Sequence, residues 1–208
     1  MITHQSICAP GPAVTLPEWR GERHYMIPFT VSSGLPRDLL RYSQAVAQMM
    51  STVEVDSEQE CYLMVDEAEL VPDTFHRRPG VHVDGYWHNT ISCHGGAPSH
   101  SPGPRHGGTP RPSPGHRPAH SASGEASEAL LLASNYAAAR AYVGQYERDF
   151  AADWRGGDCS DIALQRLAEI QLQVGRVYKL DVMSLHESRP VREHVRRTVL
   201  RINVPGGV

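Results

Sequence analysis

Residues 177–204 read VYKLDVMSLHESRPVREHVRRTVLRINV. Two segments of this stretch, Val177–Val182 and Thr198–Val204, are short and rich in β-branched and aliphatic residues, so each predicts a β-strand. Pro190 and the charged residues around it predict a surface connection between the two strands. The C-terminal quarter of the chain therefore favours a fold built from short strands.

Similar segments occur earlier in the chain. Cys61–Val65, Ala129–Asn135 and Ala141–Gly144 are short apolar runs and predict three further strands. Gly80–Trp87 (GVHVDGYW) alternates, and since side chains along a strand alternate between its two faces, His82 and Asp84 share one face.

Two segments have helical spacing. The first begins near Pro36, where proline suits the first turn of a helix. It places Leu39, Tyr42, Val46, Met49 and Met50 on one face. The second, Ile162–Val174, places Ala163, Leu167, Ile170 and Val174 on one face. Residues up to about 28 contain several prolines and glycines and are expected to wrap the surface. The predicted fold is mainly β with supporting helices (α+β), namely a β-sandwich or jelly roll with an N-terminal helix.

The length and composition suit one domain over residues 1–208. A formal net charge of −3 argues against nucleic acid as the main partner. No apolar run is long enough to span a bilayer, and no signal peptide is expected at the N-terminus. Cys8, Cys61, Cys93 and Cys159 are far apart and read as reduced thiols, so the expected location is the cytoplasm.

Residues 93–124 differ in composition from the rest of the chain. They consist almost entirely of Pro, Gly, Ser, His, Arg and Ala, with no aliphatic side chain larger than alanine. Such a segment buries too little apolar area to offset the entropy lost on ordering. We therefore expect a disordered loop insertion, although a His-rich tract can also bind metal.

His82-Val83-Asp84 is the sharpest short motif of the chain. An imidazole and a carboxylate on one strand face converge on one point. A third ligand from a distant strand would complete a two-histidine, one-carboxylate triad, a ligand set that leaves positions open and suits iron(II) and dioxygen. His186 is the best candidate, because it follows one strand and precedes the last. His194 is its rival, in a charged and exposed run.

A basic residue follows His186 in the last strand. Arg196 and Arg197 are neighbours, so only one of them can face the interior. Arg196 shares its side with Thr198 and three apolar residues. Arg197 shares its side with Val199, Arg201 and Asn203. The sequence leaves both alternatives open.

The order of these residues resembles the iron(II)- and 2-oxoglutarate-dependent dioxygenase superfamily, and its prolyl-hydroxylase-like members in particular. The resemblance covers about residues 60–205 but depends on four positions: His82, Asp84, His186, and Arg196 or Arg197. It implies a double-stranded β-helix core, iron(II) bound by the first three residues, and 2-oxoglutarate as co-substrate, with its far carboxylate on the arginine. It further implies a hydroxylase that uses dioxygen. The insertion at 93–124 departs from the core pattern.

Two other functions remain open. One is a cupin-like metal-binding jelly roll without 2-oxoglutarate, and the other is a non-catalytic jelly-roll binding or structural module. The expected substrate is a small molecule or a peptidyl residue, since the chain lacks the signature of the nucleic-acid-demethylating members. No membrane partner is expected, and the sequence is silent on the oligomeric state.

Overall fold

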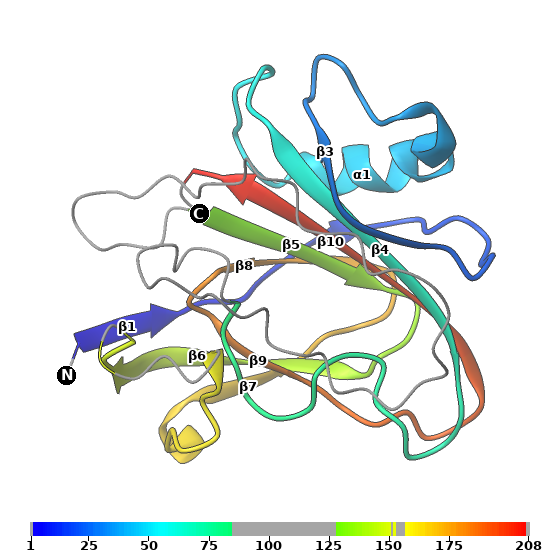
Figure 1. Ribbon diagram of the computed structural model, residues 1–208. Helices are drawn as coiled ribbons and strands as arrows, with labels where there is room; N and C mark the ends of the chain where they lie inside the picture. The colour runs from blue at the N-terminus through cyan, green and yellow to red at the C-terminus, as the bar shows by residue number, and fades with distance from the viewer. Residues whose placement is uncertain (1, 85–127, 151, 153–156, 207–208) are drawn as a thin grey trace.

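The computed structural model describes residues 2–84, 128–150, 152 and 157–206. The predicted loop at 93–124 lies outside these residues. The described part consists mainly of antiparallel β-strands arranged in two sheets, which lie in separate layers (Figure 1). The prediction of a mainly β fold with supporting helices is therefore confirmed.

The larger sheet has six strands in the order β2-β8-β5-β10-β4-β3. The long strand β10 lies between β5 and β4 and pairs with both in antiparallel register. The bounds are Ala9–Ala13 (β2), Arg23–Phe29 (β3), Cys61–Leu70 (β4), Glu128–Ser134 (β5), Arg176–Asp181 (β8) and Val195–Pro205 (β10).

The smaller sheet is organised around β6. This strand pairs with β1 along its second half and with β7 and β9 along its first half. The bounds are Ile2–Ser6 (β1), Ala139–Arg148 (β6), Ala168–Gln171 (β7) and Leu185–Ser188 (β9).

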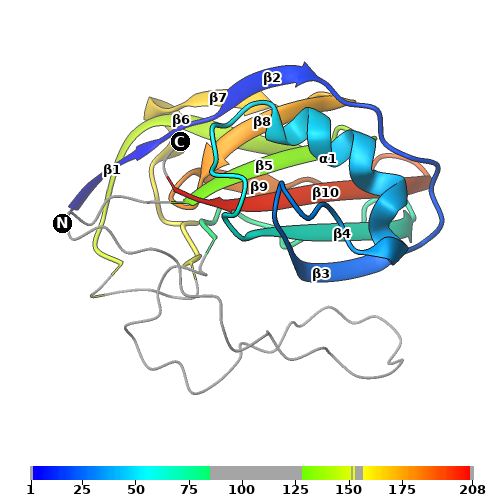
Figure 2. The ribbon, with the colours of Figure 1, turned by 90° about the horizontal axis from the view of Figure 1, so that it is seen from above.

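The predicted N-terminal helix forms as a 3-10 helix η1, Arg37–Tyr42, that continues into α1, Ser43–Met50. It lies across one face of the larger sheet (Figure 2). Its buried residues, with Leu39 and Met49 among them, pack on Leu63, Leu131 and Leu200 of that sheet. The spacing of the apolar residues is the cause, because it turns one helical stripe toward the sheet.

A second hydrophobic core lies between the two sheets. Leu130 and Leu180 come from the larger sheet, and Tyr142 and Leu185 come from the smaller one. Side chains on the larger sheet thus alternate between the core under α1 and the core between the sheets. Arg197, Val199, Arg201 and Asn203 belong to the second set, which we call the inner face of β10.

One buried carboxylate ties the N-terminal segment to the larger sheet. Glu67 of β4 is 1 % exposed and accepts hydrogen bonds from the backbone amides of Arg20 and Glu22, at 2.7 and 3.0 Å. The hydroxyl of Tyr42 also donates to Glu67, at 3.1 Å. Buried charges require such partners, so this carboxylate fixes the path of the chain before β3.

Two local predictions were wrong. Ile162–Val174 is not a helix: it contains the short 3-10 helix η3, Leu164–Arg166, and strand β7. The apolar residues of this segment also fit a period of two, and pairing with β6 decides between the two periods. Within Gly80–Trp87, the described residues form only isolated bridges, in which His82 pairs with both Asp158 and His186. The N-terminal region was expected to wrap the surface, and its residues are mostly exposed or half-buried, although they form three strands.

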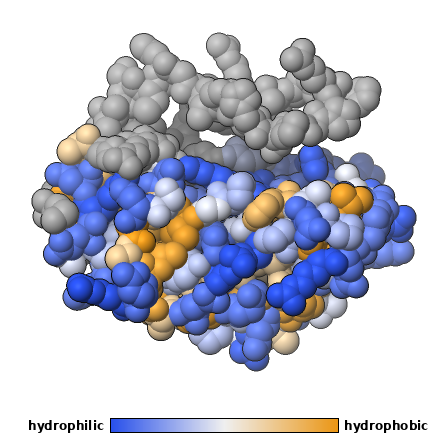
Figure 3. All heavy atoms as spheres, turned by 90° about the horizontal axis from the view of Figure 1, so that it is seen from below, coloured by the Kyte–Doolittle hydropathy of each residue, from blue (hydrophilic) through white to orange (hydrophobic). Residues whose placement is uncertain are grey.

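The face seen in Figure 3 is mostly hydrophilic, with hydrophobic residues in separate groups. Large hydrophobic side chains that are exposed come from different parts of the described chain: Ile2, Tyr25, Val31, Leu40, Val71, Phe75 and Val174. Across the described ranges, none of the helices has the length and hydropathy needed to cross a membrane.

Candidate metal centre

The fold brings His82 and His186 side by side. The two residues form an antiparallel bridge, in which each backbone amide donates to the carbonyl of the other, at 3.0 and 3.1 Å. Their ring centroids lie 4.5 Å apart. The HxD segment and the strand β9 are far apart in the sequence, and this backbone pairing is what juxtaposes their imidazoles.

Backbone carbonyls orient both rings. Nδ1 of His82 lies 2.8 Å from the carbonyl oxygen of Gly80, and Nδ1 of His186 lies 2.9 Å from that of Ser184. A carbonyl can only accept, so each Nδ1 carries a proton, and in the neutral form of such a ring Nε2 carries the lone pair. This arrangement is typical of metal-ligating histidines, whose second nitrogen is held by an outer partner.

Asp84 lies near His186. Its Oδ2 is 3.9 Å from Nε2 of His186. Arg201 donates from Nη1 to both carboxylate oxygens of Asp84, at 3.2 Å each. This contact is an ion pair between largely buried groups, with side-chain exposures of 6 % for Arg201 and 14 % for Asp84.

The surroundings set the charges of these groups. Burial, followed by the charge of His186, lowers the pKa of His82 to about 3, so its ring is neutral at pH 7. Burial alone would raise the pKa of Asp84, but the charge of Arg201 and then those of the two histidines outweigh it and hold that pKa at about 2. A neutral imidazole and an ionised carboxylate are the forms that bind a metal.

The chemical types of these three side chains suit a mononuclear metal site, but the side chains are too far apart to bind one ion as they stand. Two ligands at about 2.1 Å from a metal and at a right angle to each other lie about 3 Å apart, whereas Asp84 and His186 are separated by 3.9 Å. In the part of the chain that the structure describes, no three His, Cys, Asp or Glu side chains converge tightly enough to count as a ready-made metal cage. A bound cation would have to draw the carboxylate inward.

The two candidate arginines point in opposite directions. Arg197 is 2 % exposed, and its Nε donates to Oγ of Ser134 at 3.2 Å. Its Nη1 is buried and has no hydrogen-bond partner among the described residues. The side chain of Arg196 is 64 % exposed and lies over the ring of Trp19, at 5.0 Å from the centroid. The inner face of β10 therefore carries Arg197 and Arg201.

A small cavity of about 40 Å³ adjoins Arg197. That is room for about one water molecule or one carboxylate group. Its walls include Leu132, Ser134, Tyr136, Leu172, Tyr178 and Val199. Burial lowers the pKa of Arg197 to about 10, so the guanidinium is still charged at neutral pH. A charged, partly unsatisfied donor thus faces a mainly apolar space of carboxylate size.

Asp66 lies near Arg197 and has its own set of partners. His76 Nε2 is 3.2 Å from its Oδ1, and Arg77 Nη1 is 2.7 Å from its Oδ2. Burial would raise the pKa of Asp66, but the hydrogen bond and charge of His76 and then the charge of Arg77 hold it well below its usual range. Burial also lowers the pKa of His76, so Arg77 is the cation that persists at neutral pH.

Sequence reasoning did not anticipate the contact between Arg201 and Asp84 or the cluster around Asp66. The only available signal was that Arg201 shares a strand face with Arg197. His194, the rival ligand, has a side chain that is 60 % exposed and lies 3.9 Å from Glu69, on the outer side with Arg196.

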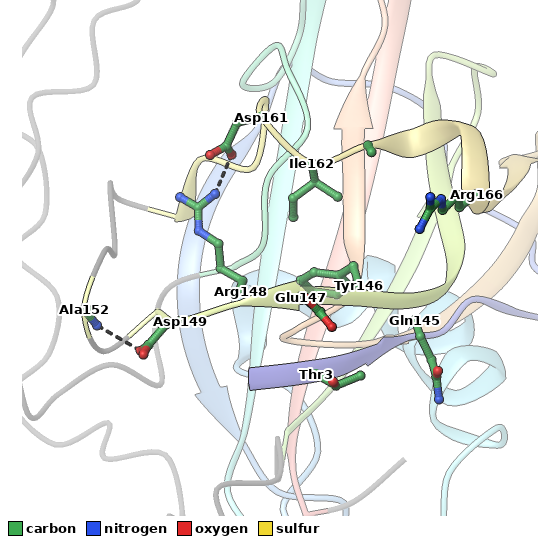
Figure 4. Close-up of a pocket in the computed structure, with 11 residues that line it drawn as sticks. Thr3, Gln145, Tyr146, Glu147, Arg148, Asp149, Ala152, Asp161, Ile162 and Arg166 are labelled. Carbon is green, nitrogen blue, oxygen red and sulfur yellow. Dashed lines mark hydrogen bonds and ion pairs between the residues drawn. The ribbon is translucent and has the colours of Figure 1, made fainter. Parts of the chain in front are cut away.

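A hollow of about 620 Å³ lies elsewhere, between the end of β6 and residues 161–166 (Figure 4). Arg148 and Asp161 form an ion pair at its wall. None of the five predicted site residues lines it. Comparison of the chain with family models, with curated proteins and with solved structures finds no match.

Proposed function

We propose that this protein is a non-haem iron(II)- and 2-oxoglutarate-dependent dioxygenase with a jelly-roll core, and that it hydroxylates a small-molecule or peptidyl substrate. The observation that carries the proposal is the inner face of β10. It presents a buried, partly unsatisfied Arg197 at one point and, four residues on, an Arg201 that contacts Asp84.

The dimensions suit 2-oxoglutarate. Four residues of strand span about 13 Å. The co-substrate has four carbon–carbon bonds of about 1.5 Å each, so it is about 5 Å long when extended. A metal bond at one end and a hydrogen bond at the other bring the total to about 10 Å. The long Arg197 side chain covers the remainder.

Each residue has a role in this proposal. His82, Asp84 and His186 would hold iron(II), and their outer hydrogen bonds would fix the orientation of the two imidazoles. Arg197, with Ser134 beside it, would bind the far carboxylate of 2-oxoglutarate through charge-assisted hydrogen bonds. When bound, iron and the co-substrate supply the oxidation of a C–H bond by dioxygen, with release of succinate and carbon dioxide.

Arg201 would position Asp84. A carboxylate has two oxygens, so Asp84 can keep one hydrogen bond to Arg201 while its other oxygen turns to the metal. Buried hydrophobic neighbours such as Met64 and Val199 exclude water from this part of the inner face. Exclusion of water strengthens the electrostatic interactions within the site.

The test is an anaerobic titration of the protein with iron(II), with and without 2-oxoglutarate. A weak visible band at about 500 nm is expected for the chelate of this ligand set. Succinate formed only in the presence of oxygen would support the proposal further. Bound iron without the band would favour the cupin-like alternative.

One observation favours the non-catalytic alternative. The ion pair between Arg201 and Asp84 already gives the carboxylate a partner, and a histidine pair held by backbone hydrogen bonds can be purely structural. A protein of this kind would bind no stoichiometric iron. The same titration therefore separates all three functions.

A further inference from the structure

Two partly exposed arginines are anchored on one carboxylate beside the candidate metal centre. The side chain of Asp66, in β4, is only 12 % exposed. Its Oδ1 lies 3.2 Å from Nε of Arg23, and its Oδ2 lies 2.7 Å from Nη1 of Arg77. The two arginines come from separate segments, since Arg23 begins the edge strand β3 and Arg77 lies in the loop before His82. We call Arg23 and Arg77 the arginine pair.

The anchoring leaves the pair accessible to a ligand. Asp66 contacts one nitrogen of each guanidinium, and Nε of Arg23 also lies 3.4 Å from the carbonyl oxygen of Glu67. A guanidinium has five N–H donors in a planar fork that matches a carboxylate or a phosphate. The side chains of Arg23 and Arg77 are 67 % and 38 % exposed, so solvent and small molecules reach both. Because Asp66 already orders them, less side-chain freedom is lost when an anion binds.

The pair lies beside the candidate centre. Asp66 is two residues along β4 from Met64, which is directly opposite Arg201 in the register of the sheet. Residues two apart on a strand are separated by about 7 Å. Burial would raise the pKa of Asp84, and the charges that lower it are those of Arg201, the two histidines and then Arg77. Such an effect fades over about 10 Å in salt solution, so an anion bound to Arg77 would lie close to the proposed metal.

The charges around the centre favour one more anion. Arg201 is paired with Asp84, and in the proposed function Arg197 is paired with the far carboxylate of 2-oxoglutarate. Asp66 then serves both members of the arginine pair with a single negative charge. The excess is felt at Arg197, whose pKa is lowered by burial and, against the opposing charge of Asp66, by the charge of Arg77. An additional anion would offset this repulsion.

We propose that the arginine pair is a substrate subsite for an anionic group, either a carboxylate or a phosphate. The inference rests on the proposed function, because it takes the molecule bound there to be the one whose C–H bond is presented to the metal. It narrows the substrate to an acid and disfavours neutral and cationic molecules. Arg197 is buried beside its small cavity, whereas the pair is accessible, so position keeps the co-substrate and the substrate apart.

The experiment uses small probes, n-butyrate and n-butyl phosphate, with n-butanol as the neutral match and n-butylammonium as the cationic one. Binding to the full, metal-free chain is followed by NMR titration of the arginine Nε–H signals, which measures even millimolar affinities. At least one of the two anions is expected to bind and to shift the signal of Arg77, whereas butanol and butylammonium are not. Comparison of the two anions identifies the recognised group as a carboxylate or a phosphate.

Four variants make the test specific. Arg77→Gln and Arg23→Gln are each expected to weaken anion binding about two- to fivefold, the usual size for a partly exposed ion pair. Arg77→Lys keeps the charge without the fork, so its loss should be smaller than that of Arg77→Gln. Arg37→Gln replaces an exposed arginine of η1, outside the pair, and should leave binding unchanged. Arg23 is the more exposed member of the pair, so its variant tests the subsite even if Arg77→Gln fails to fold.

Three results would overturn the inference. They are butanol binding as tightly as the anions, anion binding that is unchanged in both Arg77→Gln and Arg23→Gln, and an equal loss in Arg37→Gln. A second measurement places the bound anion. In protein loaded anaerobically with iron(II) and 2-oxoglutarate, the paramagnetic iron should broaden the proton signals of the probe, and Arg77→Gln should reduce that broadening. Anion binding to the loaded protein without any broadening would show that the pair does not serve the metal centre.

Failure of the subsite and failure of the proposed function are distinguishable. A visible iron–oxoglutarate band without anion binding leaves the oxygenase standing and removes the subsite. Anion binding at the arginine pair without any iron binding removes the oxygenase and, with it, the role of the pair in substrate binding.

Discussion

Replacing Arg197 by alanine tests the centre of the proposed function. The guanidinium is 2 % exposed and has one unsatisfied buried nitrogen, so a carboxylate bound there would form a desolvated charge pair. Removing one member of such a pair costs about 2–5 kcal/mol, which corresponds to a rise in the Kd of 2-oxoglutarate of about 30-fold to 4,000-fold. The adjacent Arg196 is the matched control. Its exposed charge is worth at most about 1 kcal/mol, so Arg196→Ala should change that Kd less than about fivefold.

The assay is the anaerobic titration of iron(II)-loaded protein with 2-oxoglutarate, followed through the visible band. Iron affinity, measured separately without 2-oxoglutarate, should not fall in either variant, since neither arginine is proposed as a ligand. Arg197→Met fills most of the vacated volume, and its urea unfolding midpoint controls for a general loss of stability. An unchanged Kd in both Arg197 variants, or an equal loss in Arg196→Ala, would refute the reasoning.

Three other predictions concern iron binding, the attachment of the N-terminal segment, and the loss of folding stability at acid pH. His82→Ala should weaken iron(II) binding at least about 100-fold, and His194→Ala should not; calorimetric titration of both variants decides between the two histidines. Glu67→Ala leaves buried donors unpaired and should lower the free energy of unfolding by about 3 kcal/mol in urea, against less than about 0.5 kcal/mol for the exposed Glu69→Ala. The pKa of Asp66 is lower in the folded state than the unfolded value of about 3.9, so the folded protein binds fewer protons and the stabilisation is lost as the pH falls below about 4. Asp66→Asn should therefore reduce the difference in urea midpoint between pH 6 and pH 3, and an undiminished difference would contradict this assignment.

The strands could be predicted where local composition decides them. Thr198–Val204 and Ala129–Asn135 are dense in β-branched or aliphatic residues, and both form strands of the larger sheet. The prediction of a helix at Ile162–Val174 was wrong because Ala168, Ile170 and Leu172 also alternate with the period of a strand. Only pairing with β6 selects the strand period over the helical one. The helix from Pro36 succeeded because its five apolar residues fit no other period.

Some features of the candidate site could likewise be predicted from the sequence, and others could not. The proximity of His82 and His186 followed from the order of the elements, which sequence reasoning can use. The choice between Arg196 and Arg197 depended on which face of β10 turns inward, and both alternations looked acceptable as a sequence. The contact of Arg201 with Asp84 joins residues that are remote in sequence, and no local pattern marks it.

The charges on the inner face lead to one more expectation, which links the two ligands of the proposed centre. Arg197 and Arg201 are both buried there, and Asp84 is the carboxylate that contacts Arg201. A divalent cation that enters alone adds two positive charges beside two arginines, which is unfavourable at low dielectric. A dianionic co-substrate offsets those charges. Iron(II) and 2-oxoglutarate should therefore bind cooperatively, and by linkage each should raise the affinity of the other by the same factor, about 5- to 150-fold. Calorimetric titration of each ligand with and without the other measures both factors, and independent binding would show that the arginines do not face a shared site.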